Sequence, residues 1–442
     1  MLRKAFPRKT GITGKVAIIN IVLVASAFLW YFHAFNFLRQ ITTSEELLVW
    51  GVNFAAIAVS AILGAALMSR FSRRTPFLFY WMAGGIVLSF APLMLDVTGI
   101  VGLTIISAVF GGYFGLGMPA CMGYFSASTS AEHRARIGGV TFLCIGIGVF
   151  LLGNIGLGVI GFINVATNAL ILAAMRAIGL LILLLLKVDE KPMEKEGKTS
   201  YTFILTNKTF LLYFIPWCMF SLTNYMGIPV ISKCFGEEFA HYSTIIENIL
   251  IGIFAVVGGF LADYVGRKRL AIAGFAMLGV GYAALGLLPT NEGSWWFYTI
   301  ADGIAWGSFY TVFLITLWGD LAQYHNSEKY YAIGALPYLT SNFMRIWVGS
   351  YIAEFVDVSA VFSFAAFFLF LGVLPLAYAP ETLPDKIVKE RELKNYIEKA
   401  RKEAEKAQKT EAEDTSEENG DSDVEFESSE FEEKMKEVEK YY

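Results

Sequence analysis

The chain has 442 residues, of which 55% are hydrophobic and 17% charged, and its mean hydropathy is +0.53. This composition argues against a water-soluble globular protein and is typical of a membrane protein with many crossings. The net charge of −4 is uneven, because residues 380–442 alone carry 12 Lys and Arg against 21 Asp and Glu. The basic residues form short clusters rather than one face, so no nucleic-acid partner is expected.

Twelve apolar runs follow one another along the chain, each long enough for a helix that crosses a bilayer. In lipid such runs must satisfy their backbone hydrogen bonds internally, which predicts helices and not strands. The first six predicted helices are 16–38, 47–68, 76–95, 98–125, 137–162 and 165–186. The second six are 210–231, 244–262, 270–288, 295–318, 330–353 and 358–378. The first run has no small-residue cleavage signal, so we expect a retained helix.

Lys and Arg residues are concentrated in every second loop, which indicates how the predicted helices are oriented across the membrane. If the N-terminus is cytoplasmic, the outer loops hold only Arg39 and Lys233. The inner loops then hold Arg70, Arg73, Arg74, Arg134, Arg136, five lysines within 187–208, and Arg267, Lys268 and Arg269. Because cytoplasmic loops are enriched in Lys and Arg, both termini are expected in the cytoplasm, with the protein in the plasma membrane.

The chain also matches itself at an offset of 194 residues, which nearly superposes five of the six helix starts. This repeat predicts a six-helix bundle over 1–186 and a second over 210–379. A charged linker, 187–209, joins them on the cytoplasmic face. The tail, 380–442, is expected to be helical at first and then disordered, because its later part is acidic and rich in serine.

One loop occurs in both halves at this offset, and its second copy reads GGFLADYVGRKR over residues 258–269. That copy resembles the signature loop of the major facilitator superfamily. The resemblance implies an all-α fold of two pseudo-symmetric six-helix bundles. Gly259 permits close helix approach and Gly266 a tight turn. In the family the aspartate, here Asp263, belongs to an ion-pair cluster that holds one transport conformation, and Arg267 is its nearest cation. The alternative is merely a well-capped turn.

The first copy departs from this pattern, with Ser69 in place of the aspartate and Ser72 in place of the glycine. The two halves are therefore not expected to form equivalent ion-pair clusters. After the last helix, PETLP at 380–384 resembles a motif of the sugar and organic-ion porter branches. The fourth helix lacks the arginine of many proton-coupled members, so coupling of that standard type is not supported.

Four charged residues fall within the apolar runs, where a charge must face protein or water. The family's arrangement implies that Glu247 and Arg345 lie in the same half at compatible depth, as an ion pair or as part of a substrate site. Arg176 has no buried acid to pair with in its own half, so we expect it to bind either backbone carbonyls, in a structural role, or an anionic substrate. Asp302 is the first choice for coupling to a proton or sodium ion. The alternative for Asp302 is an acid hydrogen-bonded within its own half.

Aromatic and amide side chains gather on the helices that line the central cavity in this family. Trp306 and Tyr310 lie one and two turns after Asp302, on the same face. On the first and seventh helices the expected substrate contacts are Tyr31, His33, Asn36, Asn224 and Tyr225. Aromatic rings with amide groups suit a small polar organic solute. His33 alone is either a satisfied hydrogen-bonding group or a proton carrier.

These features predict a secondary active transporter that works by alternating access, as a symporter and a monomer. No zinc, nucleophile-elbow or phosphate-loop motif occurs, so we expect neither an enzyme nor a cofactor or metal. The expected partners are the bilayer, a small-molecule substrate and a coupling ion. Two alternatives stay open: an organic-anion transporter that uses Arg176 and Arg345, and a transporter-like receptor that signals through its tail.

Overall fold

The computed structural model describes residues 14–42, 47–68, 70–154, 164–186, 199–223, 230, 234–322, 326–383 and 397. The chain divides into a unit of residues 1–384 and a second unit of residues 385–442. Apart from residue 397, the second unit lies outside the described residues, and so does the predicted organisation of the tail. All helices discussed below belong to the first unit.

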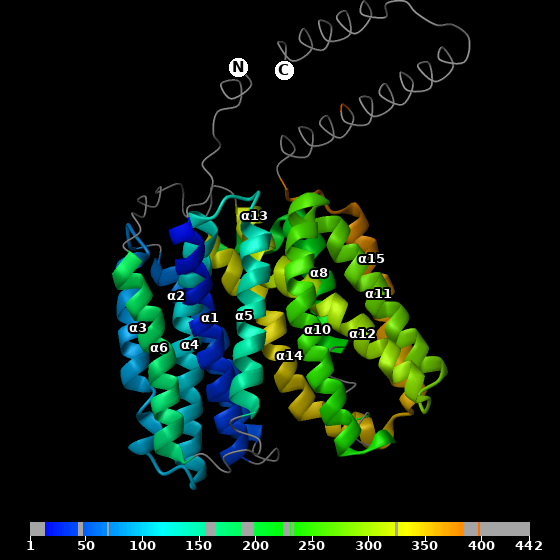
Figure 1. The fold of residues 1–442 in the computed structure, drawn as a ribbon, viewed down its shortest axis with the longest axis horizontal. Coiled ribbons are helices and arrows are strands. Elements are labelled where there is room, and N and C mark those ends of the chain that lie inside the picture. Colours follow the sequence, from blue (N-terminus) through cyan, green and yellow to red (C-terminus); the bar gives the residue numbers. More distant parts are fainter. Residues whose placement is uncertain are drawn as a thin grey trace, which may run out of the picture. The chain divides into compact units, whose positions relative to one another are not determined.

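The first half of this unit is a bundle of six long helices with one short 3-10 turn (Figure 1). They are α1 Gly14–Ile41, α2 Leu47–Met68, α3 Thr75–Leu88, η1 Ala91–Leu93, α4 Ile100–Ser128, α5 Arg134–Asn154 and α6 Val165–Leu186. Each of these long helices overlaps one of the predicted apolar runs over most of its length. The N-terminal bundle thus follows from hydropathy, with shifts at the helix ends.

The second half repeats this arrangement after a short linker helix, α7 Tyr201–Thr206. Its helices are α8 Lys208–Thr223, α10 Glu237–Tyr264, α11 Arg267–Leu287, α12 Glu292–Phe309, the π-helix η3 Tyr310–Thr316, α13 Leu317–Ala322, α14 Ser327–Phe355 and α15 Val358–Tyr378. The described residues contain no β-strand, and ten helical stretches among them are long and apolar enough to cross a membrane. The predicted helix 295–318 corresponds to three consecutive helical segments, α12, η3 and α13, because the π-helix η3 interrupts the α-helix.

The two halves meet along two seams. One seam joins α5 to α10 and the other joins α2 to α14, so each half contributes its second and fifth helices, as expected for two halves related by a two-fold axis. At the first seam the helices approach closely: a Cβ on Gly139 would lie 2.3 Å from the carbonyl oxygen of Ala255. At the second, Ala61, Ala65 and Ala332 form a small buried cluster. Small residues thus set both seams.

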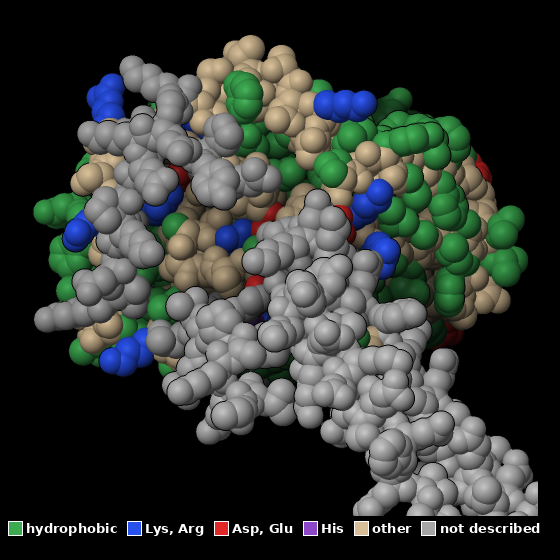
Figure 2. Space-filling model, turned by 90° about the horizontal axis from the view of Figure 1, so that it is seen from above, with side chains coloured by type: hydrophobic (Ala, Val, Ile, Leu, Met, Phe, Trp, Pro, Cys, Tyr) green, Lys and Arg blue, Asp and Glu red, His purple; other side chains and the backbone are tan. Residues whose placement is uncertain are grey.

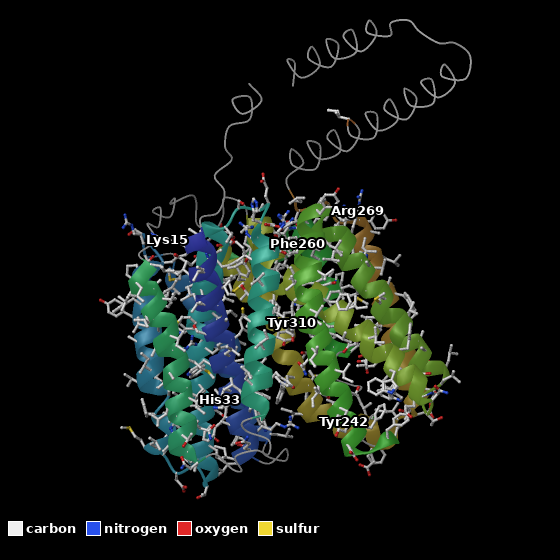
Figure 3. The ribbon with its side chains drawn as sticks, in the orientation of Figure 1. Lys15, His33, Tyr242, Phe260, Arg269 and Tyr310 are labelled. Atoms are coloured by element: carbon white, nitrogen blue, oxygen red, sulfur yellow. The ribbon has the colours of Figure 1, made fainter. Side chains whose placement is uncertain are left out.

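Basic side chains mark one end of the bundle, which we call the basic end. Lys15 and Arg269 lie at this end, whereas His33 and Tyr242 lie towards the opposite end (Figure 3). Viewed onto the basic end, Lys and Arg side chains are spread over both halves (Figure 2). Because α1 begins here and α15 ends here, the described chain enters and leaves the bundle at the same end.

Candidate functional site

Five buried or partly buried charges form an ion-pair layer across the two halves at the basic end. Arg267 pairs with Asp263 (Nη2 to Oδ1, 3.0 Å) and with Asp320 (Nε to Oδ2, 3.0 Å), all within the second half. From α5 in the first half, Arg134 pairs with Asp320, and Arg136 Nε lies 3.4 Å from Asp263 Oδ2. Arg267, Asp263 and Asp320 are almost fully buried. These pairs hold α5 of one half against α10, α11 and α13 of the other.

The signature loop supplies the local geometry for this layer. Gly259 lies against α5, since a Cβ there would be 2.5 Å from the Ala135 carbonyl oxygen. Gly266 adopts φ +112°, a left-handed conformation that favours glycine. Glu381 of the PETLP segment then accepts the backbone N–H groups of Arg267 (2.9 Å) and Lys268 (3.2 Å), where a carboxylate suits the start of α11.

A second link between the halves lies at the first turn of α14. Buried Glu328 pairs with Arg74, which precedes α3 in the first half. The neighbouring Lys329 donates to the Thr199 carbonyl oxygen (2.7 Å) and lies over the ring of Tyr201. Tyr201 donates to the Ile62 carbonyl oxygen of α2 (2.6 Å), and burial raises the pKa of its phenol to about 12. The linker helix therefore strengthens this link.

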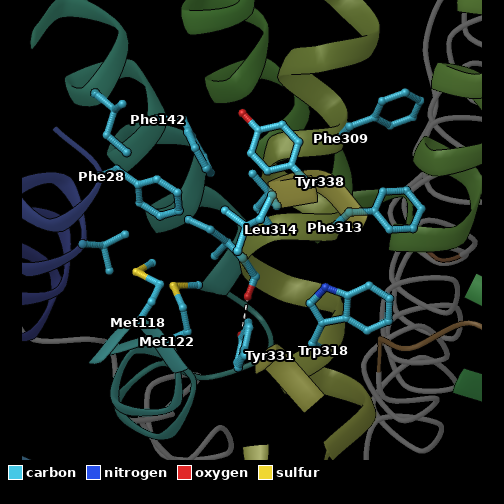
Figure 4. Packing of buried hydrophobic residues seen from close by; sticks show 14 of the residues in the cluster. Phe28, Met118, Met122, Phe142, Phe309, Phe313, Leu314, Trp318, Tyr331 and Tyr338 are labelled. Carbon is cyan, nitrogen blue, oxygen red and sulfur yellow. Dashed lines mark hydrogen bonds between the residues drawn. The ribbon is translucent and has the colours of Figure 1, made fainter. Parts of the chain in front are cut away.

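A small cavity lies between the halves, and several of the side chains that line it are drawn in Figure 4. From the first half it is lined by Phe28, Ala61, Phe114, Gly115, Met118, Pro119 and Met122. From the second half it is lined by Leu314, Tyr331, Ala332, Ala335, Tyr338 and Leu339. Leu314 belongs to η3 and the others of this half to α14, whose first turn carries the Glu328 link. The cavity therefore lies directly inside the ion pairs of the basic end.

Aromatic rings border the cavity away from the basic end. Tyr310 of η3 shares a hydrogen bond with Tyr338 (3.2 Å between hydroxyl oxygens) and stacks on Phe142 of α5 with ring centroids 4.6 Å apart. Phe28 contacts Phe142 at 5.7 Å, and Trp306 contacts Tyr310 at 4.9 Å. The predicted pair Trp306 and Tyr310 thus lies next to the cavity, on a helix that touches the other half.

Two carboxylates meet between α10 and α12 inside the second half. The carboxyl groups of Glu247 and Asp302 lie close enough to interact, and Tyr298 lies beside Asp302. Asp302 is 3% exposed, whereas Glu247 is half-buried. Two anionic carboxylates this close would repel each other, so a proton bound to the pair would favour their contact. Both neighbours of Asp302 belong to its own half, and its Oδ1 has no hydrogen-bond partner among the described residues, so its role in coupling stays a prediction.

Arg176 lies in a cage of aromatic rings in the first half. Its guanidinium carbon is 4.4 Å from the ring centre of Trp81 and 5.0 Å from those of Trp30 and Tyr113. The side chain is fully buried, and in the described part of the chain no carboxylate pairs with it. The cage stabilises the charge by cation–π attraction. Arg176 is not among the residues that line the cavity.

The other predicted site residues are scattered. Tyr31 stacks on the cavity residue Phe114 (4.1 Å), buried His33 bonds to Asn168 of α6, and Asn36 is exposed. These three do not line the cavity. Asn224, Tyr225 and the side chain of Arg345 lie outside the described residues, so the pairing of Glu247 with Arg345 stays a prediction.

Sequence reasoning missed the acids that connect the halves, Asp320 and Glu328. Both lie just outside the predicted helices 295–318 and 330–353 and are not among the predicted site residues. A usable signal was present: Asp320 and Glu328 flank the loop that corresponds, at the offset of 194 residues, to the basic loop holding Arg134 and Arg136. Acids in one copy of a repeated loop and bases in the other indicate pairing between the halves.

The fold matches solved membrane transporters. The major facilitator superfamily proton:xylose symporter XylE, bound to 6-bromo-6-deoxy-D-glucose, aligns with a TM-score of 0.61 and 17% identity over 84% of this chain and 97% of XylE. The E. coli fucose:proton symporter FucP gives 0.61 and 13% over 83% and 98%. The human organic anion transporter MFSD10 gives 0.57 and 14% over 82% and 98%.

No protein-family model and no curated protein matches the sequence. At these identities the likeness concerns the fold, and it confirms the expectation from the signature loop: the chain has the all-α fold of the major facilitator superfamily. Together with the ten apolar helices, this makes it a multi-pass membrane protein.

Proposed function

We propose that the protein is a secondary transporter that moves a small organic solute by alternating access, driven by a proton on the Glu247–Asp302 pair. The observation that carries the proposal is the cavity between two six-helix halves, bordered at one end by ion pairs that cross from half to half. Such pairs can form and break as the halves rock, which opens the cavity to each side in turn.

The coupling assignment rests on where the carboxylate pair lies. Asp302 is four residues before Trp306 and eight before Tyr310, so protonation and the cavity wall share one helix. Glu247 is half-buried whereas Asp302 is enclosed, so a proton would reach the pair through Glu247. A proton suits this pair better than sodium, because sodium needs several oxygen ligands and the described neighbours of Asp302 are chiefly Glu247 and Tyr298.

The proposed orientation in the membrane is supported by the basic end. Its excess of Lys and Arg supports a cytoplasmic location for the linker 187–209, the tail 380–442 and both termini, in the plasma membrane. The bundles 1–186 and 210–379 would then form one transport unit in a monomer. The organic-anion alternative receives less support, because Arg176 is enclosed by its aromatic cage.

The test uses purified protein in proteoliposomes that contain the pH dye pyranine. Sugars, amino acids, carboxylates and neutral aromatic compounds are added in turn, and a transported solute should carry protons inwards. Asp302→Asn should abolish this proton movement but retain exchange of labelled solute across the membrane. Glu292→Gln, an exposed carboxylate on the same helix, is the matched control and should behave as wild type.

Three outcomes would contradict the proposal at different points. Proton movement that survives Asp302→Asn and Glu247→Gln would remove the pair from coupling. Uptake driven by a sodium gradient but not by a pH gradient would replace the coupling ion. Binding of a solute without any flux would favour the receptor alternative over transport.

A further inference from the structure

The wall of the cavity between the halves has an unusual chemistry for a sugar-like solute. Its lining residues include no Asp, Glu, Lys, Arg, His, Asn or Gln among the residues that the structure describes. The two tyrosine hydroxyls are engaged: Tyr331 donates to the Ile315 carbonyl oxygen and Tyr338 bonds to Tyr310. Figure 4 shows the sulfur atoms of Met118 and Met122 facing the side chains of Leu314 and Tyr331.

One polar group of the backbone interrupts this apolar wall. Pro119 lies inside α4 and has no N–H, so the helix supplies no donor to the carbonyl oxygen of Gly115, four residues earlier. Gly115 and Pro119 both line the cavity. The lining residues therefore include one carbonyl oxygen that lacks its usual helical donor, and their side chains otherwise supply apolar and aromatic surface.

We infer that the solute held in this cavity is a neutral, largely apolar small molecule with at most one hydrogen-bond donor. A sugar would leave most of its hydroxyls without partners here, and an unpaired buried hydroxyl is costly. An ion would lack a counter-charge, because the nearby carboxylates Asp320 and Glu328 already pair with arginines. The two methionines can adapt to the shape of an apolar ligand. This inference rests on the proposed function, since it names the cargo of the same cavity.

The test uses the neutral fluorophore N-phenyl-1-naphthylamine, whose single N–H matches the Gly115 carbonyl, and purified protein in nanodiscs. Energy transfer from the protein's tryptophans should show a saturable component above lipid partitioning. Ala335→Phe, which fills the cavity, should weaken this component at least tenfold. Ala177→Phe adds the same ring at an exposed site on α6 and should leave it unchanged. Met122→Gln, an amide of similar length in the wall, should also weaken it and covers the case in which Ala335→Phe does not fold.

D-xylose and L-fucose should neither compete with the fluorophore nor raise the melting temperature. Saturable sugar binding that Ala335→Phe abolishes would overturn the inference, and so would fluorophore binding unaffected by both cavity variants. These results are separable from the proposed function. Proton-coupled sugar flux without fluorophore binding would refute the apolar cargo but support the proposed transport function. Fluorophore binding without any flux would support the apolar ligand but refute transport.

Discussion

Arg176 is a buried charge that is stabilised by rings rather than by an acid. In apolar surroundings a lone guanidinium is expensive, and a cation–π contact there is worth about 2 kcal/mol or more. Trp30 and Trp81 are themselves fixed, because their indole N–H groups donate to Ser89 (2.9 Å) and to the Tyr113 carbonyl oxygen (2.9 Å). The cage is therefore rigid, and its role is to hold α1, α3, α4 and α6 together.

A double-mutant cycle tests this role. Trp81→Leu should lower the unfolding temperature strongly in the wild type, because it removes a large packed side chain and part of the cage. In an Arg176→Met background the same change should cost less, by about 2 kcal/mol, because no charge remains to be stabilised. Arg176→Met alone should stay within about 1 kcal/mol of the wild type or exceed it. Equal costs in both backgrounds would show that the cage does not stabilise the charge.

At the scale of helices, the seam between α5 and α10 depends on reciprocal glycines. Gly139 faces the carbonyl of Ala255, and Gly259 faces the carbonyl of Ala135, one turn nearer the basic end. Each obstructing atom belongs to a backbone, so it cannot move aside as a flexible side chain would. An added methyl group at either place forces the two halves apart.

Gly139→Ala should therefore destabilise the protein by about 1–3 kcal/mol, the usual cost of overpacking. Gly112→Ala is the matched control, because it lies in helix α4 with nothing within 4 Å of the added Cβ. Replacing glycine by alanine in open helical space gains up to about 1 kcal/mol, so the control should stabilise. Thermal unfolding in detergent measures the stability of both variants. A shift of the unfolding temperature in the same direction for both would contradict the close packing of α5 against α10 at Gly139.

Hydropathy predicted the apolar middle of the helices but not the polar residues at their ends. The starts of α10 at Glu237 and α14 at Ser327 lie before the predicted positions 244 and 330, because polar first turns carry no apolar signal. The π-helix η3 was not predictable: Thr311 donates to the Ala255 carbonyl and Tyr331 to the Ile315 carbonyl, and both contacts come from distant segments. Likewise Asp263 and Arg267 pair four residues apart, as expected, whereas Asp320 meets Arg134 only in the folded chain.

At the scale of the whole molecule, the cavity and the ion-pair layer belong to one conformation. Asp320 accepts from Arg134 of the first half and pairs with Arg267 of the second, so a single carboxylate neutralises cations on both sides of the interface. Without its charge, the two arginines would repel each other across the interface. The balance between the open and closed states of the basic end should then move towards the open state.

Asp320→Asn tests this shift through a cysteine at Met122 in the cavity wall, in a chain whose native Cys121, Cys144, Cys218 and Cys234 are replaced by alanine. A membrane-impermeant maleimide applied to inside-out vesicles should label this cysteine about ten times faster in the variant, which corresponds to about 1.4 kcal/mol. Asp357→Asn removes an exposed carboxylate at the start of α15 and should not change the rate. Equal acceleration by both variants would show that the ion pairs of Asp320 do not control the opening of the basic end. Acceleration seen with intact cells instead of inside-out vesicles would place the basic end outside, against the orientation that its lysines and arginines favour.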